Sequence, residues 1–264
     1  IQTTFQNLIA SNNKALIPFL TADFPTRKLF NTFLHGLAES GASIIEIGIP
    51  FSDPMADGVI IQKTSEIAIG NGFTISHLFE DIIAFKETFP HIPIVLMTYL
   101  NPLIHYGMDH FLISAKKAGV DGLLIVDLPP ENFARVITDD HGISMIRLVT
   151  PTTDMDRLSI INSSASGFIY YVSVKGITGT QTPDPNKIQL HLSQINQLIK
   201  LPMVIGFGIN SIETAQSMAQ ISNGIVIGSR LMAPFLSADE SAFNALIKDQ
   251  LSYIKEISMA INHG

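Results

Sequence analysis

The sequence predicts a (β/α)8 barrel, the α/β architecture also called the TIM barrel, as a single domain spanning residues 1–264. Eight short runs rich in Ile and Val recur along the chain. Their nearly continuous apolar character is typical of parallel strands that are covered on both faces. Segments with a helical spacing of apolar residues separate the runs, and no linker or low-complexity segment interrupts the alternation.

The expected strands follow the apolar runs in order, from "ALIPFLTA" near the start to "GIVIGSRL" near the end. Runs of this length suit strands and are too short to cross a membrane as helices. The eight expected strands cover residues 15–22, 43–50, 93–100, 122–129, 144–151, 167–174, 202–209 and 224–231.

The expected helices alternate with these strands. In residues 26–40, apolar side chains recur at helical spacing, and Gly41 follows as a stop signal. Residues 108–119 and 211–222 are further amphipathic segments. The apolar face of the first of these helices is expected to contain Leu29, Phe33, Leu34 and Leu37.

A doubly wound open sheet is the alternative α/β fold. It usually has fewer strands and a glycine-rich turn after the first strand. Here "LTADFPT" occupies that place, and the chain contains no GxGxxG motif. The barrel is therefore the favoured prediction.

Composition and charge restrict the class of protein. The chain has a net charge of −7 and is 46% hydrophobic, which is enough for a full core. The mild acidic balance argues against a broad nucleic-acid interface, and the lack of cysteine excludes disulfides and thiolate metal sites. The eight histidines show no HxH, HExxH or HxxxH spacing, so we expect no metal site. The first residues lack a signal-peptide pattern, and we expect a cytoplasmic enzyme.

Polar and aromatic residues gather where the expected strands end. In a (β/α)8 barrel these carboxyl ends and the loops after them build the active site. The loop "VKGITGTQTPDPNK" after the sixth strand belongs to the same end. The side chains expected there are Phe19, Asp23, Glu46, Asp53, Asp57, Tyr99, Asn101, Asp127 and Tyr170.

Glu46 lies inside the apolar run "IIEIGI". Burying a carboxylate is costly unless it is paired or has a chemical role. Strand alternation places it on one face with Ile44 and Gly48, and the flanking sequence offers no obvious cation. If that face is the barrel interior, burial raises the pKa of Glu46 and suits it to proton transfer near neutral pH. From spacing alone, a structural ion pair and a catalytic role both stay open.

Two further carboxylates follow in the next loop. Asp53 lies in "SDP", a sequence typical of turns, and we interpret it as a loop organiser. Asp57 follows a Pro-Met-Ala stretch that is able to fold over a ligand. Spacing alone leaves Asp57 open between a loop role and a site role.

Small residues follow the last two expected strands, in "GFGIN" and "IGSR". Glycine lets a phosphate approach backbone N–H groups closely, and a helix N-terminus adds a favourable dipole. The loops after strands 7 and 8 are the usual phosphate position in this fold. Tight strand–helix turns are the plain alternative for each glycine taken alone. The residues concerned are Gly206, Gly208, Gly228 and Ser229.

The motifs "EIGIPFSDPMADG", "TYLNPL", "VDLP", "GITG", "GFGI" and "IGS", in this order, closely resemble the tryptophan synthase alpha subunit family. The resemblance runs from about Leu16 to the C-terminal helix. It implies cleavage of indole-3-glycerol phosphate to indole and glyceraldehyde 3-phosphate, with no cofactor. It also implies a beta subunit partner in a two-alpha, two-beta complex, for which Pro54 and Met55, with Asn101, Pro102 and Leu103, form the candidate contact.

The resemblance assigns roles by position. Glu46 matches the acid–base glutamate, and Asp57 matches the aspartate at the indole N–H. Substrate-pocket positions match Phe19, Ile61, Tyr99, Asp127, Val149, Tyr170 and Thr178. Phosphate-site positions match Gly179, Phe207, Gly208, Gly228 and Ser229.

The sequence departs from the family pattern at two places. Val59 stands where many relatives have proline, and Val174 and Lys175 stand where an Arg-Ser pair is common. Lys175 also raises the alternative of a Schiff-base aldolase, although its neighbours do not suggest a desolvated pocket. A barrel without catalysis that only activates a beta partner is the second alternative.

Overall fold

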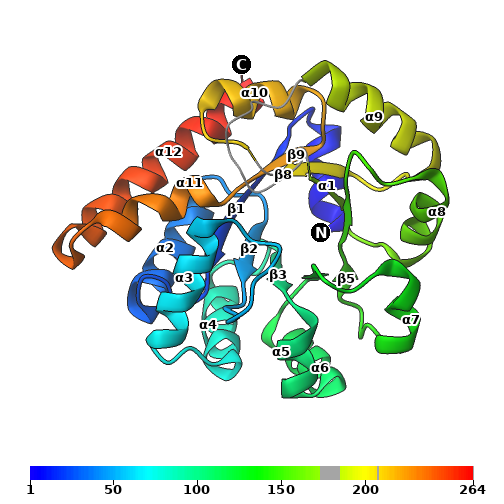
Figure 1. Ribbon diagram of the computed structural model, residues 1–264. Helices are drawn as coiled ribbons and strands as arrows, with labels where there is room; N and C mark the ends of the chain where they lie inside the picture. The colour runs from blue at the N-terminus through cyan, green and yellow to red at the C-terminus, as the bar shows by residue number, and fades with distance from the viewer. Residues whose placement is uncertain (173–184, 207, 264) are drawn as a thin grey trace.

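The computed structural model describes residues 1–172, 185–206 and 208–263, and its centre is a parallel sheet rolled into a barrel (Figure 1). Nearly every strand residue is buried, as the continuous apolar runs predict. The strands in the described residues are β1 (Ala15–Thr21), β2 (Ile45–Gly48), β3 (Ile94–Thr98), β4 (Gly122–Ile125), β5 (Ser144–Met145), β6 (Arg147–Val149), β7 (Ile169–Val172), β8 (Met203–Gly206) and β9 (Gly224–Ile227).

The fifth expected strand closes the barrel in two pieces. The strand order is β5-β4-β3-β2-β1-β9-β8-β7-β6, with parallel pairing throughout. β5 pairs with β4 and β6 pairs with β7, so the two pieces lead from one neighbour to the other. Between them, the Ile146 N–H donates to the Leu123 carbonyl at 2.9 Å. The predicted (β/α)8 barrel is therefore confirmed, with its fifth strand divided at Ile146.

Helices surround the barrel and connect its strands (Figure 1). Most of the long ones follow a strand and return the chain to the start of the next one. The α-helices in the described residues are α1 (Gln2–Ala10), α2 (Arg27–Glu39), α3 (Val59–Gly70), α4 (Ile75–Thr88), α5 (Leu100–Tyr106), α6 (Met108–Ala118), α7 (Phe133–Val136), α8 (Met155–Ser164), α9 (Pro185–Leu198), α10 (Ile212–Gln220), α11 (Ser229–Met232) and α12 (Phe243–His263). Short 3-10 turns are η1 (Pro130–Asn132), η2 (Ala233–Ser237) and η3 (Glu240–Ala242).

Helix α2 shows how the local sequence sets an element. Thr26 caps its start by accepting a hydrogen bond from the Leu29 N–H, and Gly41 follows its end with a φ of +96°. A side chain at Gly41 would also meet the Ser258 hydroxyl of α12. The apolar face is buried as predicted, except that Phe30 is fully buried and Leu29 only partly so.

Helix α1 covers the amino-terminal end of the barrel. Its Phe5 packs on Phe168, which precedes β7, with ring centroids 5.7 Å apart. The Ile1 side chain lies so close to Gly122, at the start of β4, that a Cβ there would be 2.8 Å away. This packing leaves the carboxyl ends of the strands as the end at which a site can form.

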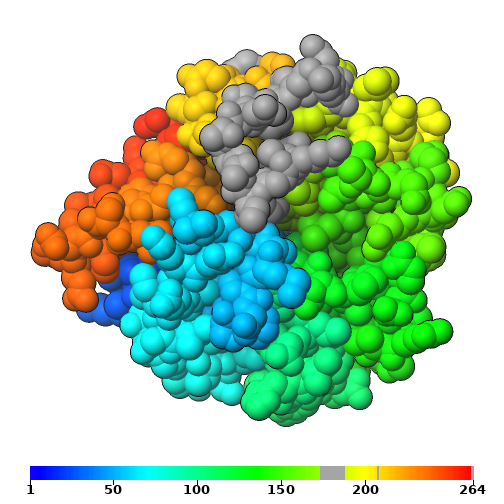
Figure 2. All heavy atoms as spheres, in the orientation of Figure 1, coloured from blue at the N-terminus to red at the C-terminus, as the bar shows by residue number. Residues whose placement is uncertain are grey.

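The visible face of the molecule carries the segments that follow the strands. In Figure 2 the light-blue segment after β2 lies near the middle of this face. Across the described ranges, none of the helices combines the length and the apolar character that crossing a bilayer requires.

Candidate active site

Glu46 lies in the middle of β2, level with Phe19 of β1 and Val95 of β3. Its side chain is 1% exposed. Neither carboxylate oxygen has a hydrogen-bond partner among the described residues, and no ion pair to it is present there. The structure therefore removes the structural ion pair as an explanation for this buried carboxylate and favours the chemical one.

The surroundings of Glu46 change its acidity. Burial raises the pKa of Glu46 to about 8, and the nearby Asp57 carboxylate contributes to the rise. A carboxyl group with this pKa holds its proton at neutral pH and releases it at little cost. It is thus able to act as a general acid first and as a general base afterwards.

Asp57 is held in place by its backbone. Its N–H donates to the Pro54 carbonyl at 3.0 Å, and its own carbonyl accepts from the Gln62 side chain at 2.8 Å. Burial raises the pKa of Asp57 to about 6, while a hydrogen bond from the Tyr99 hydroxyl opposes the rise. Asp57 is therefore mostly ionised at pH 7, beside a Glu46 that is mostly protonated.

Tyr99 organises the loop that carries Asp57. Its hydroxyl accepts the Ala56 N–H at 2.9 Å and also contacts the Asp57 carboxylate. Burial and that carboxylate raise the pKa of Tyr99, so the phenol stays protonated as a donor. The sequence marked Tyr99 only as a pocket position and gave no role to Gln62. Neither partnership has a signal in sequence spacing.

Two glycines make room for the aromatic side chains of the site. A Cβ at Gly48 would lie 2.5 Å from the Phe19 ring, and one at Gly206 would lie 2.3 Å from the Tyr170 hydroxyl. Tyr170 is buried, and its pKa is raised by burial and then by the charges of Glu46 and Asp57. Gly206 thus makes room for the Tyr170 ring, and the phosphate role expected for it stays a prediction.

Val149, which the family resemblance assigns to the substrate pocket, faces the other side of its strand. The register pairs Leu148 with Tyr170 and Val149 with Tyr171. The Tyr171 hydroxyl hydrogen-bonds His191 of the outer helix α9 at 3.0 Å. Because side chains alternate along a strand, Leu148 shares the side of Tyr170, and Val149 faces the helix layer.

Asp127 and Ile61 complete the described pocket positions. The Asp127 carboxylate accepts the Leu100 N–H at 2.7 Å at the start of α5, so it has a structural task whatever else it binds. Ile61 lies in the first turn of α3 and is 8% exposed. Thr178 falls outside the described residues, as do Gly179, Phe207, Val174 and Lys175.

Comparisons with known proteins identify the family of this chain. A family model described as "Tryptophan synthase alpha chain" matches residues 5–261. The chain belongs to this family. It is 42% identical to the alpha chain of Paraburkholderia phymatum over 265 residues, which cover 99% of this chain and 96% of that one. It is also 42% identical to the alpha chain of Laribacter hongkongensis over 238 residues, with 89% and 90% covered.

Solved structures of the tryptophan synthase alpha chain family have the same fold. The alpha subunit from Legionella pneumophila str. Paris superposes with a TM-score of 0.88 at 34% identity, covering 98% of this chain and 97% of that one. A chain of tryptophan synthase from M. tuberculosis, in an aminoacrylate-bound form, gives a TM-score of 0.85 at 26% identity, with 99% and 98% covered. The resemblance read from the motifs is confirmed, and with it the assignment to a family of carbon–carbon lyases.

Gly208, Gly228 and Ser229 are the described residues of the expected phosphate site. Gly208 has a φ of +79°, a conformation that side chains disfavour. Gly228 caps α11, whose first N–H groups have no partner within the helix, and Ser229 is the first residue of that helix. α11 has only four residues, so its dipole is weaker than the sequence suggested.

Proposed function

We propose that Glu46 and Asp57 carry out the cleavage of indole-3-glycerol phosphate to indole and glyceraldehyde 3-phosphate. The supporting observation is a buried carboxyl group without a protein partner, with its pKa raised to about 8, beside a carboxylate whose pKa is about 6. Two acids with separated pKa values permit one donor and one acceptor at the same pH.

The reaction begins with proton transfer to the indole ring. Protonated Glu46 gives its proton to C3, and positive charge develops on the ring nitrogen. Ionised Asp57 stabilises that charge and accepts the N–H proton, which gives the indolenine tautomer. Because both groups are shielded from water, their effect on developing charge is larger than in solution.

Cleavage of the C3–C3′ bond follows. Glu46, now ionised, takes the proton of the C3′ hydroxyl, and the oxygen's electron pair forms the aldehyde carbonyl. The electrons of the broken bond restore the aromatic ring, and the ring nitrogen takes back its proton from Asp57. Glu46 ends protonated and Asp57 ionised, so the site is ready for another turnover.

Release of indole by the purified full chain tests the proposal directly. Indole formed in step with glyceraldehyde 3-phosphate supports it. The absence of indole release, alone and with a beta subunit, would instead favour the barrel without catalysis. Borohydride with substrate provides a second control, because a Schiff-base aldolase would be trapped as a covalent adduct.

The pH profile of kcat/KM is expected to be bell-shaped, with limbs near pH 6 and pH 8. Below the lower limb Asp57 gains a proton and no longer stabilises positive charge, and above the upper limb Glu46 loses the proton that it must donate. The two values belong to the interacting pair. Asp57→Asn should remove the lower limb from the residual activity, which distinguishes Asp57 from titration of the substrate phosphate. A flat profile between pH 5 and 9 would contradict these roles.

Gly228→Asp is expected to weaken binding of glyceraldehyde 3-phosphate more than binding of indole. The new carboxylate repels a phosphate that approaches the start of α11. Gly228→Ala is the matched control, because its Cβ makes the same 3.2 Å approach to Phe19 without the charge. Calorimetry that finds equal phosphate-ligand affinity for the two variants would argue against this phosphate position.

The proposed setting is a complex with a beta subunit in the cytoplasm, in a two-alpha, two-beta assembly that uses the indole for L-tryptophan synthesis. Support comes from an exposed apolar surface around the loop after β2. Met55 is 80% exposed, Val59 61% and Ile104 59%. Leu103 is fully buried, so the sequence-based choice of Leu103 as a contact is wrong and its neighbour Ile104 replaces it.

A further inference from the structure

Arg147 is a buried cation outside the acid–base site. It lies on β6, its residue is 5% exposed, and its Nε and Nη2 atoms have no hydrogen-bond partner among the described residues. Within the described ranges its guanidinium group stacks on the Phe133 ring of α7, whose centroid is 4.0 Å from the guanidinium carbon. Burial lowers the pKa of Arg147 to about 10, so the group is still charged at neutral pH. A buried charge without a counter-charge is costly, and such groups usually have a ligand or a partner.

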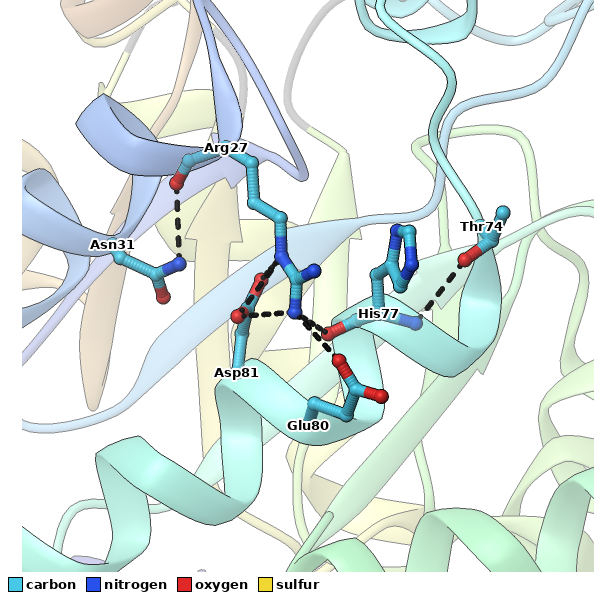
Figure 3. Close-up of polar contacts among 6 residues, drawn as sticks. All are labelled: Arg27, Asn31, Thr74, His77, Glu80 and Asp81. Atoms are coloured by element: carbon cyan, nitrogen blue, oxygen red, sulfur yellow. Dashed lines mark hydrogen bonds and ion pairs between the residues drawn. The ribbon is translucent and has the colours of Figure 1, made fainter.

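The two unpartnered nitrogens form one edge of the guanidinium group. The N–H bonds of Nε and Nη2 are parallel and match the two oxygens of a carboxylate. This chain uses the same edge elsewhere, as Figure 3 shows for Arg27 at the start of α2. There Nε donates to Oδ2 of Asp81 and Nη2 donates to Oδ1, each at 2.9 Å. The Nε–Nη2 edge of Arg27 thus binds a carboxylate. The same edge of Arg147 has no partner among the described residues.

A cavity of about 360 Å³ adjoins Arg147, between the end of β4, the fifth strand and α8. This volume is at the lower end of the range for small-molecule sites. Three threonine hydroxyls line it, and Thr150 contacts the hydroxyls of Thr152 at 2.9 Å and Thr153 at 3.2 Å. Four aliphatic residues also line it, namely Ile125, Ile146, Leu148 and Ile161. Neither Glu46 nor Asp57 contributes to this lining, but Asp127, an expected substrate-pocket position, does, so the cavity adjoins that pocket without containing the two catalytic carboxyl groups.

We infer that this cavity binds a small organic carboxylate, whose two oxygens accept the Nε and Nη2 protons of Arg147 while the threonine hydroxyls contact the rest of the molecule. The other charges at the cavity favour a monoanion. Asp127 and Asp154 also line it, and their carboxylates repel a phosphate dianion more strongly than a carboxylate. Both Arg147 nitrogens are themselves buried, so the ligand enters by displacing part of the wall. The ion pair then forms away from water, where it is strong.

The test uses the full chain with sodium acetate as the probe, against sodium chloride at equal ionic strength and against neutral acetamide. The first readout is the ¹⁵Nε resonance of Arg147. We expect acetate to shift this resonance with saturation, and chloride and acetamide to leave it in place. The second readout is thermal unfolding. At an acetate concentration of ten times Kd, the unfolding equilibrium constant should fall about tenfold.

Two variants assign the effect to Arg147. Arg147→Met should abolish the protection by acetate, and it is expected to fold because an apolar chain replaces an unpaired buried charge. Arg157→Met is the matched control, since Arg157 lines the same cavity but is half-exposed and ion-paired with Glu131 at 3.4 Å. It should keep the protection. No acetate-dependent shift at Arg147 in the unmodified chain, or equal protection in Arg147→Met, would overturn the inference whether or not the variants fold well.

Discussion

Glu46→Gln is expected to lower lyase turnover by at least about 10²–10⁴-fold, the usual contribution of one acid–base group. The loss should exceed this range because Glu46 acts first as the acid and then as the base. The amide keeps the size of the side chain and can neither donate an acidic proton nor accept one. Measurement of indole release under saturating substrate, with and without a beta subunit, gives the size of the loss. Affinity for glyceraldehyde 3-phosphate should stay close to that of the unmodified chain, because Glu46 lies on β2, whereas the expected phosphate position is at the start of α11.

The fold of this variant is expected to survive. Burial raises the folded-state pKa of Glu46 from 4.5 to about 8, so the stability that is fully present below pH 4.5 is lost progressively as the pH rises to about 8. Glutamine has no such loss, so the variant should melt no lower than the unmodified chain at pH 5 and higher at pH 7 and above. Glu66→Gln, at an exposed position of α3, is the matched control and should change neither property. Near-normal turnover in Glu46→Gln would remove this residue from the mechanism.

Much of the fold is readable from the sequence because strands covered on both faces leave a strong apolar signal. The runs predicted the barrel, and Gly41 predicted the end of α2 through its left-handed backbone. The division of the fifth strand at Ile146 has no such signal, since β5 and β6 together form one apolar run. The error at Val149 has the same origin, because register decides which face a strand residue occupies.

The candidate site was predicted in its residue types but not in its contacts. Sequence spacing left open whether Glu46 has a cation beside it, and only the three-dimensional neighbourhood removes that alternative. The same signal, a charge inside an apolar run, occurs a second time at Arg147 in "SMIRLVTP" and was not singled out. The two opposite charges do not form an ion pair. Alternation along the strands aims Glu46 at the barrel interior and Arg147 at the helix layer.

Met55→Asp is expected to abolish most of the activation of this chain by a cognate beta subunit. We predict slow cleavage by the isolated chain and an increase of about 10²-fold in the complex, because small shifts of a catalytic group change rates by this order. Met55 is 80% exposed on the loop after β2, and a charge there disfavours burial in an apolar interface. Indole release, titrated with the beta subunit, measures the effect.

The loop offers a direct route from this surface to the chemistry. Met55 is followed by Ala56, whose N–H donates a hydrogen bond to the Tyr99 hydroxyl. Tyr99 in turn contacts the Asp57 carboxylate. A partner that fixes Met55 therefore fixes the position of Asp57. Without a beta subunit, the cleavage rate and melting temperature of Met55→Asp should be nearly those of the unmodified chain. Met259→Asp, at a 49% exposed position of α12, is the control and should keep the activation by the beta subunit. A lower melting temperature for Met55→Asp alone would show that Met55 supports its own barrel, and full activation of that variant would place the partner elsewhere.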